Sequence, residues 1–162
     1  TTPLAAASIA QVHEAVLKTG ERVVLKIQRP EIRRIIEQDI SILTGMARLL
    51  EKYVPETRIL SPQIFAEEFF RTLAQELDFR VEANNMAKIS DNFKNMPEIV
   101  VPKIYREMSG ERLLIQEKLE GIRVTDPAAL DAAGIDRTAV VQTGARAFFH
   151  SVMIHRLFHA DL

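Results

Sequence analysis

Alternating apolar positions near the N-terminus predict two β-strands. Residues 9–17 and 22–28 are rich in Val, Ile and Leu, and the Gly-containing segment between them is typical of a tight turn. In the second strand, the period of two places Val24 and Lys26 on the same face. A β-hairpin with a lysine on one face is therefore expected.

A helical period follows this hairpin. Apolar residues recur at near-helical spacing from Ile32 to Leu50, after Pro30, which is favoured as the first residue of a helix. The Ser-Pro pair at 61–62 begins a second apolar stripe, which predicts one continuous helix out to about Met96.

The rest of the pattern predicts another hairpin and two helices. Residues 100–107 and 112–119 flank a Met-Ser-Gly-Glu turn and indicate two more strands. Asp126 and Asp136 are expected to cap two helices, the second of which ends near His155. Because strands, helices, strands and helices follow in this order, the fold class is α+β.

Composition and charge narrow the function classes. The 162 residues suit one domain, and 21 Lys and Arg against 22 Asp and Glu leave no global field to attract nucleic acid. The absence of Cys excludes disulfides, thiolate chemistry and zinc–thiolate sites. No apolar run approaches the roughly 18–20 residues that a membrane span requires.

Two groups of charged residues are candidates for chemistry. Lys26 follows a loop of small residues and could bridge two phosphates, although a lysine on an exposed strand is usually solvated. Glu76, Asp78 and Glu82 lie on a predicted helix. They form either a solvated polar face or a set from which one carboxylate pairs with Lys26.

Two further segments have both a functional and a structural interpretation. Residues 113–121 could form a linker between two lobes that bonds an adenine edge, or a simple edge strand with a turn. His159 and Asp161 follow a helix and could supply a base or a water-positioning carboxylate. His155 and His159 are four residues apart, but no H-E-x-x-H motif accompanies them and a metal pair is not expected.

In this order, the motifs resemble the UbiB/AarF family of atypical protein-kinase-like proteins, which is associated with ubiquinone and other isoprenoid-quinone lipid metabolism. The resemblance rests on A-A-A-S at 5–8, V-V-L-K-I-Q-R-P at 23–30, E-L-D-F-x-x-E at 76–82, I-Q-E-K at 115–118 and F-H-A-D at 158–161.

This resemblance implies a truncated protein-kinase-like fold. Residues 1–120 would form the small lobe, with a family-specific helical insert at about 30–62 and a paired helix at about 62–96. Residues 121–162 would begin the large lobe, up to the catalytic loop.

The resemblance also implies roles for single residues. Lys26 would contact the α- and β-phosphates of ATP, and Glu82 would pair with it. Val24 would line the adenine pocket and Glu117 would lie in the interlobe linker. Asp161 matches the catalytic-loop aspartate, which accepts the proton of the substrate hydroxyl.

Two family motifs complete the implied site. Glu76 and Asp78 match a Glu-x-Asp motif that reaches toward the nucleotide and toward a Lys/Gln motif upstream. The loop formed by Ala5, Ala6, Ala7 and Ser8 would cover the nucleotide where kinases have glycines. Alanines prefer negative φ and add methyl groups, so we expect a stiffer loop that tunes nucleotide preference. The alternative is that this segment begins a helical turn.

The implied function is an atypical kinase or ATPase that binds ATP or ADP with Mg²⁺ and supports isoprenoid-quinone biosynthesis. By the resemblance, the metal ligands lie downstream of Leu162, so no metal ligands are expected within this chain and it should be inactive alone. Quinone-biosynthesis proteins or a lipid membrane surface are the implied partners. The implied location is cytoplasmic, with membrane association open, or mitochondrial or plastid in a eukaryote.

Two alternatives differ from an enzyme. One is a pseudokinase regulator that binds nucleotide without turnover. The other is a non-catalytic helical interaction module, in which Lys26 and Glu82 do not meet.

Overall fold

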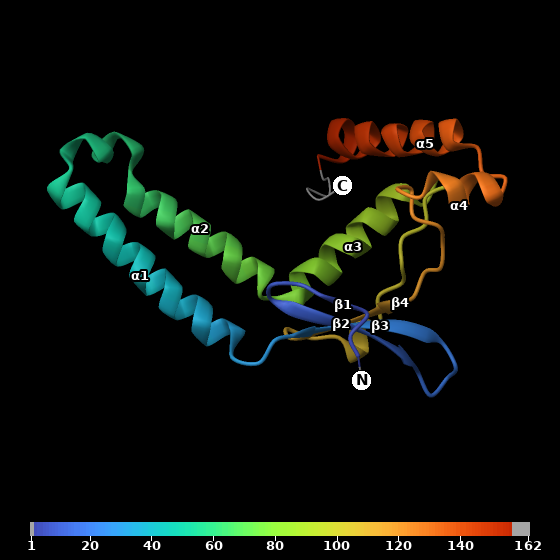
Figure 1. Cartoon of the computed structure of the whole chain (residues 1–162), viewed down its shortest axis with the longest axis horizontal. Helices are drawn as coiled ribbons and strands as arrows, with labels where there is room; N and C mark the ends of the chain where they lie inside the picture. Colours follow the sequence, from blue (N-terminus) through green and yellow to red (C-terminus); the bar gives the residue numbers. More distant parts are fainter. Residues whose placement is uncertain (1, 157–162) are drawn as a thin grey trace. The chain divides into compact units, whose positions relative to one another are not determined.

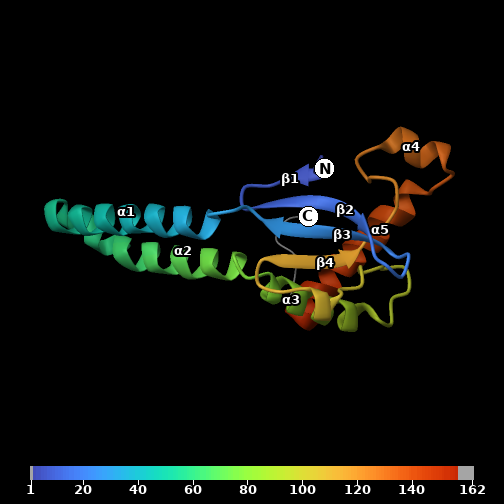
Figure 2. The same ribbon diagram turned by 90° about the horizontal axis from the view of Figure 1, so that it is seen from below.

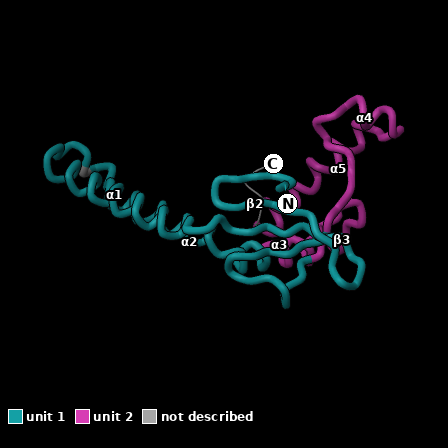
Figure 3. Tube along the Cα trace, turned by 60° about the horizontal axis from the view of Figure 1, so that its bottom comes forward, with its two compact units in different colours: residues 1–84, 104–117 teal, residues 85–103, 118–162 magenta. Residues whose placement is uncertain are grey.

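A computed structural model describes residues 2–156 of the chain. These residues divide into two compact units (Figure 3). The first unit comprises the residues up to 84 together with 104–117, and the second comprises 85–103 together with those from 118 onward. One boundary between these units falls within a helix, between residues 84 and 85, so the units are not the two predicted lobes. The predicted lobe boundary at residue 120 stays a prediction.

The first unit contains a four-stranded antiparallel sheet (Figures 1 and 2). Its strands lie in the order β1 (Ala5–Ala6), β2 (Ala10–Val16), β3 (Arg22–Gln28) and β4 (Leu113–Glu117). The predicted hairpin of β2 and β3 is confirmed, and Gly20 takes a φ of 92° in its turn, where glycine is favoured. In the central strand β3, Lys26 pairs with Val12 on one side and with Leu114 on the other.

Apolar side chains form the core beside the sheet. Ala10, Val23 and Leu114 are fully buried, and Phe79 is 1% exposed. Burying such side chains is the main source of stabilisation for a sheet of this size. The core therefore lies around the centre of β3, where Lys26 also sits.

Two long helices form a hairpin that extends beyond the sheet (Figures 1 and 2). They are α1 (Ile32–Tyr53) and α2 (Pro62–Glu76), joined by the 3₁₀ helix Pro55–Leu60. The helix α1 begins two residues later than predicted, because Glu31 adopts a left-handed conformation with φ 61°. The Glu51 carboxylate accepts a hydrogen bond of 3.1 Å from the Gln63 N–H, which fastens the start of α2 to the end of α1.

The prediction of one helix over 62–96 is wrong. The chain breaks after α2, and a separate helix α3 (Phe79–Phe93) follows. At the break, the Leu77 carbonyl accepts a hydrogen bond from the Gln28 side chain, and the Phe79 N–H donates to the Glu111 carbonyl at 3.0 Å. These backbone groups are engaged by other elements, so they cannot continue the helix. The hairpin partner of α1 is thus α2, and Glu82 lies on α3.

The prediction of a strand at 100–107 is also wrong for most of its length. Only Ile104 forms an isolated bridge, with Gln116, and Arg106–Met108 form a 3₁₀ turn. Pro102 has no N–H to donate to a ladder, which opposes a regular strand here. The turn is closed instead by Ser109, whose hydroxyl oxygen accepts a hydrogen bond of 3.0 Å from the Ile115 N–H.

Two helices of the second unit follow the predicted caps. They are α4 (Pro127–Ala132) and α5 (Arg137–His150), and a π-helical turn, Ser151–His155, extends α5. Asp126 accepts a hydrogen bond from the Ala129 N–H, and Asp136 accepts from the N–H groups of Thr138 and Ala139. Both N-caps are confirmed. Within residues 2–156, no helix combines the length and the apolar character of a membrane span.

Candidate functional site

Lys26 and Glu82 form a bidentate ion pair. The Lys26 Nζ lies 2.9 Å from Glu82 Oε1 and 2.7 Å from Oε2, although the two residues are 56 positions apart in sequence. The first comes from the middle of β3 and the second from the first turns of α3. The structure therefore brings together the two residues whose pairing the motifs predicted.

An aromatic ring supports this pair from one side. The Lys26 Nζ lies 5.0 Å from the centroid of the Phe79 ring, within the range of a cation–π interaction. Phe79 is the first residue of α3 and is buried in the core. The ammonium group is thus held between a carboxylate and a ring face.

The ion pair remains accessible to a ligand. The Lys26 side chain is 29% exposed and the Glu82 side chain 37% exposed. A pair with this exposure contributes only about 0–1 kcal/mol to stability, so stability alone explains its geometry poorly. An ammonium group held in one place but open on one side can bind an anion such as a phosphate.

The Ala-rich segment forms a short strand and a tight turn. Ala5 and Ala6 pair with β2, and the Ala7 N–H donates to the Ala10 carbonyl at 2.9 Å. The interpretation as a helical turn is therefore wrong. Neither these alanines nor Ser8 is among the described residues with positive φ, in agreement with the expectation for alanine.

Arg29 holds this segment against the end of β3. Its Nε donates to the Ala7 carbonyl at 3.1 Å, and its backbone N–H donates to the Ile9 carbonyl at 2.9 Å. The position of the Ala-rich loop is thus fixed by a residue three places after Lys26.

Val24 and Glu117 lie on neighbouring strands. Val24 pairs with Gln116 of β4, and Glu117, the last residue of that strand, pairs with Val23. Both are partly exposed, Val24 on the strand that carries Lys26 and Glu117 on the strand beside it. Their roles toward an adenine ring and in an interlobe linker stay predictions.

Asp78 lies in the break between α2 and α3 and binds the start of α3. Its carboxylate accepts hydrogen bonds of 2.9 Å and 2.8 Å from the Arg80 side chain and one of 3.0 Å from the Arg80 N–H. The hydrogen bond from the Arg80 side chain is the main reason that the pKa of Asp78 lies below its usual value, and it raises the pKa of Arg80. Glu76 is exposed at the end of α2. The reach of these two carboxylates toward a nucleotide stays a prediction.

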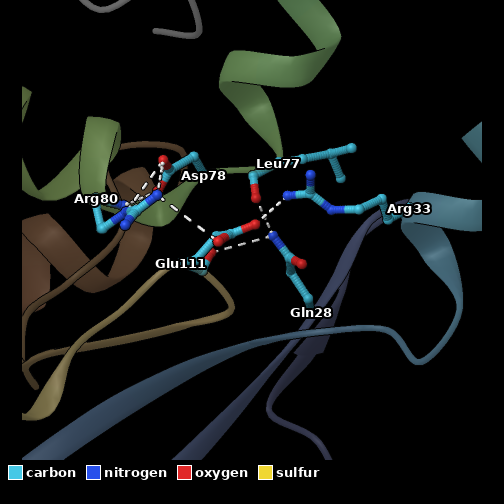
Figure 4. Close-up of polar contacts among 6 residues, drawn as sticks. All are labelled: Gln28, Arg33, Leu77, Asp78, Arg80 and Glu111. Carbon is cyan, nitrogen blue, oxygen red and sulfur yellow. Dashed lines mark hydrogen bonds and ion pairs between the residues drawn. The ribbon is translucent and has the colours of Figure 1, made fainter. Parts of the chain in front are cut away.

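The sequence reasoning missed a polar cluster beside the site. Figure 4 shows Gln28, Arg33, Asp78, Arg80 and Glu111 gathered around the Leu77 carbonyl. The motif V-V-L-K-I-Q-R-P contains Gln28 and Arg29, but only Val24 and Lys26 received a role in it. No residue-type pattern in the sequence marks Gln28 and Arg29, because their side chains bind backbone carbonyls.

The remaining predicted residues are at the C-terminal end of the chain, and only some of them are among the described residues. Asp161 and His159 lie outside the described residues. The His155 ring lies 4.9 Å from the His150 ring, centroid to centroid. Across residues 2–156, no three His, Asp or Glu side chains gather so that they could hold a metal ion. The part of a Mg-ATP site that these residues fit is the phosphate contact, through Lys26.

Comparisons with known proteins agree with the motifs. All of residues 1–162 match the ABC1 atypical kinase-like domain. The chain is 43% identical over 161 residues to a probable protein kinase UbiB of Aliivibrio fischeri, covering 99% of this chain and 30% of that protein. It is 42% identical over 160 residues to a probable protein kinase UbiB of Cellvibrio japonicus, covering 99% of this chain and 29% of that protein.

A solved structure is similar in fold. It is the Rv3197–erythromycin complex from Mycobacterium tuberculosis, with a TM-score of 0.66 and 30% identity over 77% of this chain and 31% of that one. The chain thus spans about a third of the length of the proteins it matches. The match over its full length shows that the chain belongs to the ABC1 atypical kinase-like family, with UbiB proteins among its relatives.

Proposed function

We propose that the whole protein binds Mg-ATP and acts as an atypical kinase or ATPase in isoprenoid-quinone biosynthesis, with ubiquinone as the product class. The observation that carries this proposal is the bidentate Lys26–Glu82 pair, at 2.9 Å and 2.7 Å, in a chain that belongs to an atypical kinase-like family. The relatives named probable protein kinase UbiB support the reaction class, and the link to quinones follows from the family resemblance.

Each residue of the site has a physical task in this proposal. Lys26 binds the α- and β-phosphates as a point charge, and Glu82 keeps its ammonium group in position. Val24 and Glu117 lie along the adenine side. Mg²⁺, when bound, supplies positive charge that neutralises the triphosphate. Asp161 would accept the proton of the acceptor hydroxyl, or orient the attacking water.

The Ala-rich loop favours a small acceptor over a protein in this proposal. Its methyl groups keep the backbone of residues 5–7 from lying directly on phosphates. We propose a lipid-related acceptor, or water, and a site of action at a membrane surface on the cytoplasmic side. Quinone-biosynthesis proteins are the proposed partners.

The test uses the full-length protein with Lys26→Ala and Asp161→Asn variants, and Lys18→Ala as a control in the exposed turn. Mg-dependent nucleotide binding and phosphate release are measured for each. We expect Lys26→Ala to weaken binding about tenfold or more and to abolish turnover, since a charge-assisted contact is lost. We expect Asp161→Asn to bind nucleotide without turnover.

Two results would change the proposal. Binding that is lost only with Lys26→Ala, with no turnover in any form, would make the protein a nucleotide-sensing pseudokinase. Variants that match the Lys18→Ala control in both binding and turnover would contradict the nucleotide site altogether.

A further inference from the structure

Gln28 is a buried polar residue just beyond Lys26 on the same strand. It is 8% exposed, and a buried amide at the end of a strand requires hydrogen-bond partners. Its side-chain Nε2 donates to the Leu77 carbonyl and, at 3.3 Å, to the Glu111 carbonyl (Figure 4). Its backbone N–H donates to the Arg112 carbonyl at 3.0 Å.

The two carbonyls mark the place where the chain leaves α2 and enters α3. Leu77 is the residue directly after α2, and its carbonyl faces Gln28. The Glu111 carbonyl accepts a second hydrogen bond, of 3.0 Å, from the N–H of Phe79, the first residue of α3. One amide side chain of β3 is thus bonded to both backbone carbonyls that fix the start of α3.

Charged side chains surround this junction (Figure 4). The Glu111 carboxylate pairs with Arg33 of α1 and lies 3.7 Å from Arg80, which in turn binds Asp78. The Arg80 side chain is 62% exposed, so its ion pairs contribute little to the stability of the junction. The buried hydrogen bonds of Gln28 therefore contribute more than these ion pairs to holding the start of α3 against β3.

The start of α3 determines where Glu82 lies. Glu82 follows Phe79 by about one helical turn, so the two side chains lie on the same side of α3. Both contact the Lys26 ammonium group, the ring at 5.0 Å and the carboxylate at 2.9 Å and 2.7 Å. A shift of the first turn of α3 would separate Glu82 from Lys26.

We infer that Gln28 is a positioning residue for the Lys26–Glu82 pair, and that its amide acts by holding the first turn of α3 against the end of β3. Its side-chain hydrogen bonds go to the Leu77 and Glu111 carbonyls and to neither partner of the pair, so it acts through the position of Glu82. The consequence for nucleotide affinity rests on the proposed function, whereas the consequence for the helix does not.

The test compares Gln28→Met with Gln38→Met in the full-length protein. Methionine keeps the length of the side chain but has no donor, and Gln38 is an exposed position on α1. Hydrogen exchange is measured by mass spectrometry for residues 79–84 and for strands β2 and β3. Gln28→Met should speed exchange in residues 79–84 about tenfold while the strands change little, since one or two buried hydrogen bonds are lost.

Nucleotide affinity supplies the second measurement, in a double-mutant cycle with Glu82→Gln. Gln28→Met should weaken Mg-ATP binding about tenfold when Glu82 is present and less than twofold in the Glu82→Gln background, because Gln28 acts through Glu82. If Gln28→Met does not fold, Gln28→Asn replaces it, because the shorter amide cannot reach both carbonyls.

Three results would overturn the inference. They are unchanged exchange in residues 79–84, faster exchange spread evenly over the sheet, and an affinity loss as large without Glu82 as with it. If the parent protein binds no nucleotide, the proposed function fails, and the exchange measurement alone decides the role of Gln28.

Discussion

Three alanines limit the backbone conformations of the segment before β2. Ala5, Ala6 and Ala7 keep negative φ, and Arg29 fixes the Ala7 carbonyl at 3.1 Å. Glycine at these positions would allow positive φ and let N–H groups turn toward phosphates. The alanines therefore favour one loop conformation, and under the proposed function this conformation limits how closely the loop approaches a nucleotide.

Glycine substitution in this loop should change nucleotide preference. With Ala5, Ala6 and Ala7 all replaced by Gly in the full-length protein, we expect a several-fold change in the ratio of ATP to ADP affinity and more transfer to added protein substrates. The physical reason is that the loop gains access to positive φ and loses the methyl groups. Fluorescent-nucleotide competition measures the ratio.

A matched control separates this effect from general loosening of the sheet. Ala15→Gly places a glycine in β2, at the position opposite Val23. If the loop variant and this control show the same affinity and selectivity as the parent protein, the hypothesis about the alanines is wrong.

The carboxylate of Asp78 should make a pH-dependent contribution to stability. The hydrogen bond from Arg80 holds the pKa of Asp78 below its ordinary value of 3.8 in the folded protein. For a lowered pKa, the stabilisation is complete above the unfolded value and is lost as the pH falls through the folded one. The Asp78–Arg80 contact should therefore act fully at neutral pH and fade below about pH 4.

Comparison with Asp78→Asn isolates this charge, because asparagine remains a good N-cap for α3. The parent protein should be more stable in urea by up to about 1 kcal/mol at pH 7, given that the Arg80 side chain is 62% exposed. The difference should shrink as the pH falls below 3.8. A difference that stays constant down to pH 3 would show that the ionised form is not what stabilises the fold.

At the scale of elements, the sequence correctly predicted the strands and helices that local signals determine. The β2–β3 hairpin follows from alternating residues around Gly20, and α4 and α5 follow from caps at Asp126 and Asp136. Each of these signals lies within a few residues of the element it defines, so no knowledge of the tertiary structure was required.

The break between α2 and α3 has no such local signal. The apolar stripe runs through Leu73, Leu77 and Val81 without interruption, which is why one helix was predicted. The groups that end α2 are the side chain of Gln28, 49 residues away, and the Glu111 carbonyl. Here, tertiary hydrogen bonds end α2 although the helical periodicity of apolar residues continues.

The candidate site was predictable to the extent that a motif fixes its spacing. The Lys26–Glu82 pair could be named because the family resemblance assigned both residues, although 56 positions separate them. Gln28 and Arg29 could not be assigned, because their partners are backbone carbonyls, which leave no residue-type pattern in a sequence. Motifs thus record the charged pair of the candidate site more clearly than the residues that we propose position it.

At the scale of the whole molecule, the hairpin of α1 and α2 exposes a large apolar surface. Ile42, Met46 and Leu49 of α1 are 55–61% exposed, and Phe65 of α2 is 73% exposed. Large exposed apolar patches mark contact surfaces. The chain also spans only about a third of the length of its relatives.

The 162-residue chain produced alone should therefore associate through this hairpin. Light scattering coupled to size exclusion should give a mass that rises with protein concentration, because burying large apolar side chains releases roughly 25 cal/mol per Å². The double variant Met46→Ser, Phe65→Ser should lower that mass toward the monomer. Val141→Ser serves as the control, since Val141 is 65% exposed but lies in the second unit. A monomeric parent chain, or equal association of both variants, would show that the hairpin surface does not drive self-association.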